Sequence, residues 1–241
     1  MDSTSPVCTL AEERRETGGL LPLENALARD GYAIARGAPF PPDFTEFWND
    51  LPLDTFMADG GRYRRRRYAT FALEAGTITP RPAEPHYQSL AYNPLNGGIA
   101  RHFAPFAPDA AAHPRLLGLL RDAEALFARS APGARWHVEA HQFRILAGSG
   151  NAGQPTPEGL HRDGVDRVLV QLVARQNVAG GVTRITDLEG GTLNRTTLTM
   201  PGDLYVLDDR RVMHEVSPVR PADPARPGWR DVLVVTFRRR D

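Results

Sequence analysis

The sequence predicts an α+β fold that is mainly β, an antiparallel sandwich or barrel with helices supplied by the N-terminal half of the chain. From residue 137 onward, short runs of β-branched and aromatic residues alternate with Gly, Pro and Asp turn signals. Seven or eight such runs within about 100 residues are typical of a sandwich or barrel. Before residue 132, the strongest pattern is an apolar stripe at helical spacing.

The N-terminal half contributes the predicted helices and one long irregular segment. Residues 113–130 form the best predicted helix, because apolar residues recur along one face of it. Residues 74–112 are rich in Pro and Gly, and irregular segments of this length often cover a functional site. The other expectations here are a loose leader over 1–20, a helix over 23–29 that stops near Gly31, a strand over 32–35, a helix over 41–50 and a strand over 62–73.

The C-terminal half contributes the predicted β core. Its turn signals include Gly180-Gly181, Gly190-Gly191 and Pro201-Gly202-Asp203. The predicted strands cover residues 137–147, 165–174, 181–187, 192–200, 203–207, 212–219 and 231–238. We therefore expect a single domain over residues 1–241, in which 1–136 form a helical and irregular layer with a lid and 137–240 form the core.

Composition excludes several classes of protein. The chain has 241 residues with 29 basic and 29 acidic side chains, and this zero net charge argues against a nucleic-acid partner. No window approaches the ~18 apolar residues of a transmembrane helix, and no secretory signal is visible, so we expect no membrane association. Cys8 is the one cysteine, which rules out an internal disulfide and a Cys-based zinc site. A cytoplasmic protein fits these features best.

Two of the seven histidines lie in sequences that suggest a metal site. His161 and Asp163 are separated by one residue, so in an extended chain both side chains point to one face. His214 lies in a predicted strand much later in the chain. Two imidazoles and a carboxylate form the 2-His-1-carboxylate set that binds Fe(II) and leaves adjacent coordination positions open. Because His-X-Asp is also common by chance, a surface hydrogen-bonded pair is the alternative.

Arg230 is a candidate anion-binding residue. It immediately precedes the last predicted strand and follows His214 in the chain. A guanidinium holds a carboxylate by two parallel charge-assisted hydrogen bonds, so an arginine deep in the sandwich suits an anionic ligand. The alternative is an ordinary arginine at a strand end, since Arg238, Arg239 and Arg240 show how common exposed arginines are in this chain.

In this order the motifs resemble those of the iron(II)/2-oxoglutarate-dependent dioxygenases, which have the double-stranded β-helix (jelly-roll) fold. The family order is His-X-Asp, a Gly-Gly-X-Thr hairpin (Gly180 to Thr183), a Pro-Gly-Asp turn, the distal His214 and a basic residue at the last strand. The chain is similar in particular to the bacterial subgroup that includes L-isoleucine 4-hydroxylase and related free-amino-acid hydroxylases. That closer match rests on residues 158–164, 175–181, 207–214 and 228–237.

The resemblance implies a dioxygenase in which His161, Asp163 and His214 bind Fe(II) and Arg230 pairs with 2-oxoglutarate. It implies a jelly roll with N-terminal helices packed on one sheet, and a small-molecule substrate, a free L-amino acid, that reacts with O2. Gln142 shares a strand face with Arg144, and it is a further candidate for the cofactor unless that face points outward. The alternative function is a jelly-roll ligand- or metal-binding protein without turnover. The oligomeric state stays open, a homodimer included.

Three other features have competing interpretations. The run Arg64–Arg67 is expected to be a solvated strand edge, and the alternative is that one of these arginines points inward and holds a substrate carboxylate. Residues 84–103 are the candidate lid, on the length of the segment alone. Asp208-Asp209 is expected to be a simple turn, and His137 and His141 are expected to be packed or surface histidines. The lid carries His86, Gln88, Tyr92, Asn93 and Gly97-Gly98.

Overall fold

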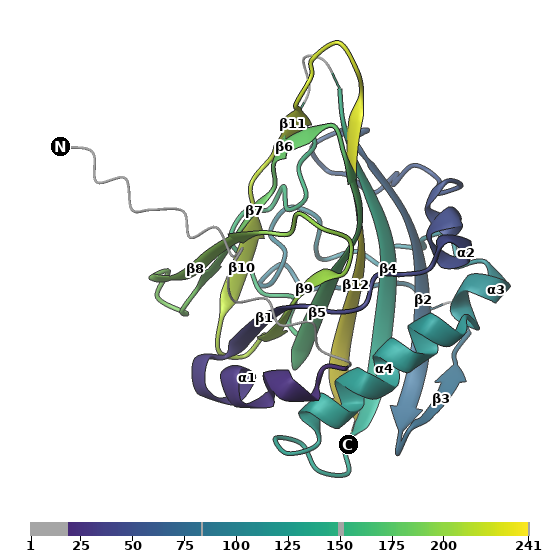
Figure 1. The fold of residues 1–241 in the computed structure, drawn as a ribbon, viewed down its shortest axis with the longest axis vertical. Helices are drawn as coiled ribbons and strands as arrows, with labels where there is room; N and C mark the ends of the chain where they lie inside the picture. Colours follow the sequence, from purple (N-terminus) through teal and green to yellow (C-terminus); the bar gives the residue numbers. More distant parts are fainter. Residues whose placement is uncertain (1–18, 83, 149–151, 241) are drawn as a thin grey trace.

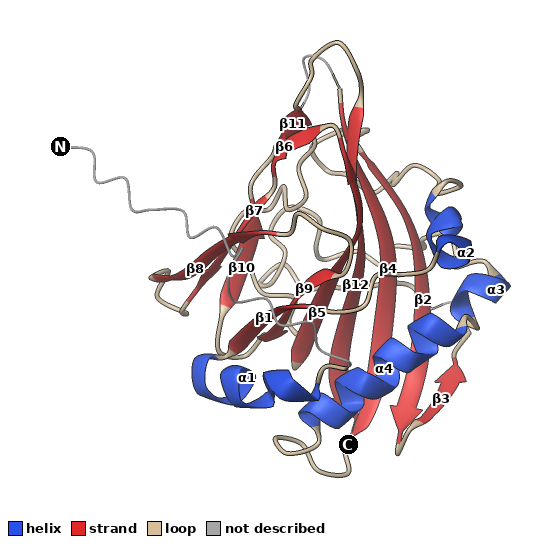
Figure 2. Ribbon diagram, in the orientation of Figure 1, coloured by secondary structure: helices blue, strands red, loops and turns tan. Residues whose placement is uncertain are grey.

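The structure, a computed structural model, describes residues 19–82, 84–148 and 152–240. Almost all of the predicted leader, with Cys8, lies outside these residues. The predominance of strands over helices confirms the predicted mainly β class (Figure 2). In the part of the chain that is described, no helix is long and apolar enough to cross a lipid bilayer.

The largest sheet has seven antiparallel strands in the order β1-β9-β5-β12-β4-β2-β3. Three of these strands come from the N-terminal half, so residues 1–136 supply part of the main sheet as well as the helical layer that the sequence predicted. The strands are β1 (Tyr32–Arg36), β2 (Arg64–Glu74), β3 (Thr77–Pro80), β4 (Arg135–Ala147), β5 (Arg167–Gln176), β9 (Asp203–Asp208) and β12 (Gly228–Arg240).

Two smaller sheets complete the β structure of the described residues (Figure 1). A three-stranded sheet has the order β10-β7-β8, and a two-stranded sheet pairs β11 with β6. The predicted strand over residues 212–219 is therefore two strands in different sheets. The bounds are β6 (Val178–Gly180), β7 (Val182–Thr186), β8 (Thr192–Thr197), β10 (Met213–Val216) and β11 (Val219–Pro221).

Helices cover one face of the main sheet, as predicted (Figure 1). The best predicted helix is α4 (Pro114–Phe127), which buries Leu116, Leu120 and Phe127 against that face. The helix α1 (Glu24–Asp30) ends at Gly31, whose φ of 80° is the left-handed conformation typical of a helix C-terminus. The other helical segments are η1 (Leu21–Leu23), α2 (Pro42–Thr45), η2 (Glu46–Trp48) and α3 (Pro108–Ala111).

The side chains of β12, β4 and β2 alternate between the helical layer and the opposite face of the sheet. In β12, Leu233, Val235 and Phe237 pack against the helices. The intervening residues Val232 and Val234 point to the opposite face, where a second apolar cluster joins the main sheet to Ile185 of β7. This cluster includes Val168, Val170, Tyr205 and Val212. The space between the main sheet and the smaller sheets holds the candidate site.

Candidate active site

A cavity of about 890 Å³, including the space at its mouth, lies on the sheet face opposite the helices. Strands β2, β4, β10 and β12 contribute to its lining, and so do the loops around residues 86–101 and 155–165. It brings together His161, Asp163, His214 and Arg230, four of the five site residues that the sequence predicted.

The two predicted histidine ligands are held together by their own backbones. His161 and His214 form an isolated antiparallel bridge, in which the amide of His161 donates to the His214 carbonyl at 3.1 Å and the amide of His214 donates back at 2.9 Å. Their ring centroids are 4.5 Å apart. Because this pairing is a backbone property, the spacing of the two imidazoles does not depend on a bound ion.

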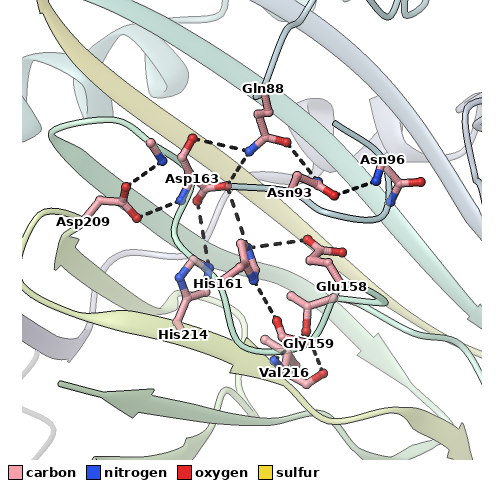
Figure 3. Close-up of polar contacts among 12 residues, drawn as sticks. Gln88, Asn93, Asn96, Glu158, Gly159, His161, Asp163, Asp209, His214 and Val216 are labelled. Carbon is pink, nitrogen blue, oxygen red and sulfur yellow. Dashed lines mark hydrogen bonds and ion pairs between the residues drawn. The ribbon is translucent and has the colours of Figure 1, made fainter. Parts of the chain in front are cut away.

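Asp163 completes the set of three (Figure 3). One of its carboxylate oxygens lies 3.8 Å from Nε2 of His161, and the other lies 4.0 Å from Nε2 of His214. One ligand atom from each residue lies within 4.8 Å of the others, close enough to share one metal ion. Two imidazoles and a carboxylate are the donors that Fe(II) accepts in a facial arrangement, so this set fits the ion.

Neighbouring groups orient the ligand atoms. Nδ1 of His161 lies 2.8 Å from the carbonyl of Gly159, which accepts its proton and leaves the Nε2 lone pair free for a metal. The side-chain amide of Gln88 donates to Asp163 Oδ1 at 3.1 Å, so the candidate lid reaches the metal set directly. Such outer contacts fix the tautomer of a ligating histidine and the direction of a ligating carboxylate.

Asp209 holds the loop that carries Asp163. Its carboxylate accepts the backbone amides of Asp163, Gly164 and Val165 at 2.9, 2.8 and 3.1 Å. Asp209 therefore does more than the simple turn that the sequence predicted. The sequence contains no signal for this contact, because Asp209 and Asp163 are distant along the chain and meet only in the fold.

The charges around this set favour a cation. Burial and the neighbouring Asp163 carboxylate raise the pKa of Asp209 to about 6, which reflects crowded negative charge. Burial and the nearby His161 ring lower the pKa of His214 to about 4, so His214 is neutral and able to ligate near neutral pH. Glu158 adds a third carboxylate, with Oε1 at 3.5 Å from His161 Nε2.

A second set of two histidines and a carboxylate, His86, Glu139 and His141, lies in the same cavity. The Glu139 carboxylate and one ring nitrogen of each histidine already have partners. Glu139 accepts from the Tyr68 hydroxyl at 2.9 Å and pairs with His86 Nδ1 at 3.0 Å, while His141 Nδ1 lies 2.6 Å from a nitrogen of Arg66. The buried guanidinium beside this set disfavours a cation, so the set around Asp163 fits a metal better.

Arg230 is buried in the cavity wall rather than exposed at a strand end. It lies inside β12, opposite Ile145 of β4 and Arg175 of β5. Burial lowers its pKa to about 10, so the guanidinium is still protonated at neutral pH. Its Nε and Nη2 have no hydrogen-bond partner among the described residues. Unpaired buried donors are costly, and a carboxylate ligand would satisfy them.

The prediction that Gln142 lines the cavity is wrong. His141 and Phe143, its neighbours in β4, line the cavity, so strand alternation points Gln142 and Arg144 to the opposite face. Arg144 there makes a bidentate pair with Asp231, at 2.8 and 2.7 Å. Gln142 and Arg144 do share a face, as the sequence predicted, but that face packs toward the helices.

The expected solvated edge at Arg64–Arg67 is also wrong. Along Arg64–Arg67, strand β2 pairs with β4 on one side and Leu53 bridges to Arg65 on the other, so this stretch is not an open edge. Arg64 and Arg66 are buried and line the cavity, whereas Arg65 and Arg67 point away from it. The candidate lid contributes His86, Gln88, Asn93 and Arg101 to the cavity wall.

The fold and the metal-binding geometry define a family of oxygenases, and the comparisons with known proteins agree. The family model of the 2OG-Fe dioxygenases matches residues 45–236, and the chain belongs to this family. It is therefore an Fe(II)/2-oxoglutarate-dependent dioxygenase, which acts on a small molecule with O2, and its sheets form the double-stranded β-helix that the resemblance implied.

Individual relatives support this assignment. The chain is 28% identical over 200 residues to 3(1)-hydroxy-L-isoleucine 4-dioxygenase of Pantoea ananatis (strain AJ13355). The matched region covers 80% of this chain and 79% of that protein. The chain is also similar to a bsmA homolog from Methylobium petroleophilum PM1 whose crystal structure is known. The two share 36% sequence identity and a TM-score of 0.84, and the match covers 97% of this chain and 96% of that chain. The crystal structure of IDO from Bacillus thuringiensis shares the fold, with 18% identity, a TM-score of 0.74 and coverage of 91% and 99%.

Proposed function

We propose that His161, Asp163 and His214 bind the ferrous ion of this dioxygenase, that Arg230 binds 2-oxoglutarate, and that the substrate is a free L-amino acid. The observation that carries the proposal is the convergence, in one cavity, of a 2-His-1-carboxylate set and a buried guanidinium with unpaired donors. Family membership favours this function over a jelly-roll binding protein without turnover.

The protein's part in the reaction is to position groups and exclude water. When bound, the ferrous ion and 2-oxoglutarate supply the oxidising chemistry that inserts an oxygen atom from O2 into a carbon–hydrogen bond. Gly159 fixes the His161 tautomer, and Asp209 holds the Asp163 loop in place. Arg230 offers two buried donors to the far carboxylate of 2-oxoglutarate. The apolar side chains of Val170 and Val232 line the cavity and help keep water out.

A free amino acid suits the charges of the cavity. The relative from Pantoea ananatis is named for the oxidation of a hydroxylated L-isoleucine. The cavity of this chain contains buried guanidiniums and, in Glu158, a buried carboxylate whose Oε2 has no partner in the part of the chain that is described. Groups of both signs complement a zwitterion better than they complement a neutral ligand. A cytoplasmic location remains a prediction.

The first test concerns the metal and the cofactor. Adding Fe(II) and 2-oxoglutarate to the protein without oxygen should produce a weak visible absorption band, because a chelated keto acid on ferrous iron absorbs there. The variant His161→Ala should lose the band. His102→Ala, at an exposed histidine, should keep it. A band of full strength in His161→Ala would overturn the metal assignment.

The second test concerns the substrate. A panel of aliphatic L-amino acids should contain at least one that stimulates succinate formation and appears in the mass spectrum with one additional oxygen atom. Succinate formation that no amino acid stimulates above the uncoupled rate would overturn the substrate assignment and leave the metal assignment in place.

A further inference from the structure

Three buried arginines form a basic cluster in the same cavity as the predicted metal ligands. Arg64 and Arg66 come from β2, and Arg101 comes from the candidate lid; their exposed fractions are 5%, 4% and 2%. Burying a guanidinium is expensive unless its charge and its N–H groups are matched by partners. The partners of these three side chains therefore indicate what the cluster is built to hold.

The protein satisfies only part of the hydrogen-bonding capacity of the cluster. Asp54 accepts from Arg64 Nε at 2.8 Å and lies 3.5 Å from Arg66 Nη1. Arg101 Nη2 donates to Gln88 at 2.9 Å. One nitrogen of each guanidinium stays without a partner among residues 19–82, 84–148 and 152–240, namely Arg64 Nη2, Arg66 Nε and Arg101 Nε. Three buried cationic donors thus remain without a partner in the described part of the chain.

The guanidinium of Arg66 is held rigidly within the cluster. The guanidinium of Arg66 lies over the rings of Phe103 and Phe143, at 3.4 and 4.5 Å from their centroids, which fixes its plane. Three carboxylates lie near the cluster: Asp54, which is bound to Arg64; Glu139, which is occupied by Tyr68 and His86; and Glu158, which favours the charged form of Arg101. Burial and the neighbouring Arg64 lower the pKa of Arg66, and a bound anion would oppose this shift by favouring the charged guanidinium.

Gln88 joins the cluster to the predicted metal ligands. Its carbonyl oxygen accepts from Arg101 Nη2 at 2.9 Å, and its amide donates to Asp163 Oδ1 at 3.1 Å. One side chain therefore separates the cluster from a ligand of the metal. Arg230 has its own unpaired donors on β12, so the cavity offers two separate positions for anions.

We propose that Arg64, Arg66 and Arg101 bind the carboxylate of the substrate, while Arg230 serves the carboxylate of 2-oxoglutarate. The inference rests on the proposed function and defines its substrate class as small molecules with an ionised carboxylate near the carbon that reacts. The cluster selects against amides and esters of the same molecules, because these cannot satisfy three cationic donors.

The first experiment needs no variant. The protein loaded with Mn(II) and 2-oxoglutarate is titrated by calorimetry with L-valine, L-leucine and L-isoleucine, and with the carboxamide of each. At least one free acid should bind, and its carboxamide should bind at least about 100-fold more weakly. The carboxamide lacks the negative charge and one of the two acceptor oxygens that the arginines would bind. A carboxamide that binds as tightly as its acid, or a protein that binds 2-oxoglutarate and none of the acids, would overturn the proposal.

The second experiment assigns the effect to the cluster. Arg101→Gln and Arg66→Gln should weaken the best acid at least about 30-fold, while the affinity for 2-oxoglutarate stays within about twofold. Arg65→Gln, at the neighbouring residue of β2 that points away from the cavity, is the matched control and should bind both ligands normally. If Arg101→Gln weakens 2-oxoglutarate and spares the acid, the two anion positions are misassigned. If the wild-type protein with Mn(II) binds no 2-oxoglutarate, it is the proposed function that fails.

Discussion

Two sets of two histidines and a carboxylate face the same cavity, and they differ in their surroundings. Asp163, the carboxylate of one set, is close to Asp209, and its partner His161 has Nε2 beside the Glu158 carboxylate and Nδ1 bonded to a backbone carbonyl. In the other set, His141 contacts Arg66 and Glu139 is occupied by Tyr68 and His86. The same three donor types therefore suit a cation in one set and accompany an anion position in the other. Neighbouring charge and unoccupied ligand atoms, more than residue type, decide what each set binds.

Metal content should show the largest contrast between the two sets. His214→Ala removes a proposed ligand, and we expect the purified, Mn(II)-equilibrated variant to lose its bound metal. His141→Ala, the equivalent change in the other set, should keep the metal content of the wild type. Mass spectrometry of the metal after desalting measures both. Metal loss in His141→Ala with retention in His214→Ala would reverse the assignment of the two sets.

Cofactor affinity should distinguish Arg230 from the arginines of the basic cluster. Arg230→Met should raise the Kd for 2-oxoglutarate by a factor equivalent to about 2–5 kcal/mol, because a buried charge pair loses one partner. Metal content should not change. Calorimetric titration of the Mn(II) protein measures the effect, with Arg65→Gln as the control. Unchanged affinity in Arg230→Met would show that the far carboxylate binds elsewhere.

Stability at acid pH should report on His86 and His141, the histidines beside the basic cluster. Burial, and for His141 the adjacent Arg66, lowers the pKa of His86 and His141 below the ordinary value of 6.5. As pH falls below 6.5, the two imidazoles become protonated in the unfolded chain but stay neutral in the folded protein. Acid therefore favours the unfolded state, and the free energy of unfolding decreases. Each histidine adds up to about 1.4 kcal/mol per pH unit to this slope.

Urea unfolding of the chelator-treated protein between about pH 5.5 and 7.5 measures that slope. His141→Gln retains an acceptor for Arg66 and removes one titrating imidazole, so its stability should fall less steeply with acid than that of the wild type. Equal slopes in the two proteins would show that His141 titrates alike in the folded and unfolded states.

The smallest effect should come from the opposite face of the sheet. Both amide atoms of Gln142 are buried and lack a partner within the described ranges. Gln142→Met keeps the shape of the side chain and removes the unsatisfied groups, so we expect stability to rise by about 1 kcal/mol and 2-oxoglutarate affinity to stay unchanged. Urea unfolding and the Mn(II) titration measure these. A weakening comparable to that of Arg230→Met would place Gln142 at the cofactor after all.

The sequence predicted which side chains share a strand face better than it predicted which face lines the cavity. Alternation in a strand shows which residues share a face, and Gln142 with Arg144, or Arg64 with Arg66, do so. It does not show which face meets the cavity, since both faces of β4 and β2 are covered. The three predicted metal ligands could be recognised because their motifs follow one another along the chain in the order typical of the family. The contacts of Asp209 and Gln88 with Asp163 join residues far apart in the chain, and no local pattern predicts them.

The backbone bridge between His161 and His214 has a consequence for how the enzyme acquires its ion. The backbone bridge places the two imidazoles side by side before any ion binds. Most of the conformational entropy of ordering these two ligands is therefore lost when the protein folds, and little more is lost when the ion binds. The apoprotein should therefore persist as a loadable species, and exchange of one divalent ion for another should proceed without unfolding. Ion choice then rests on what the cell supplies as much as on the protein itself.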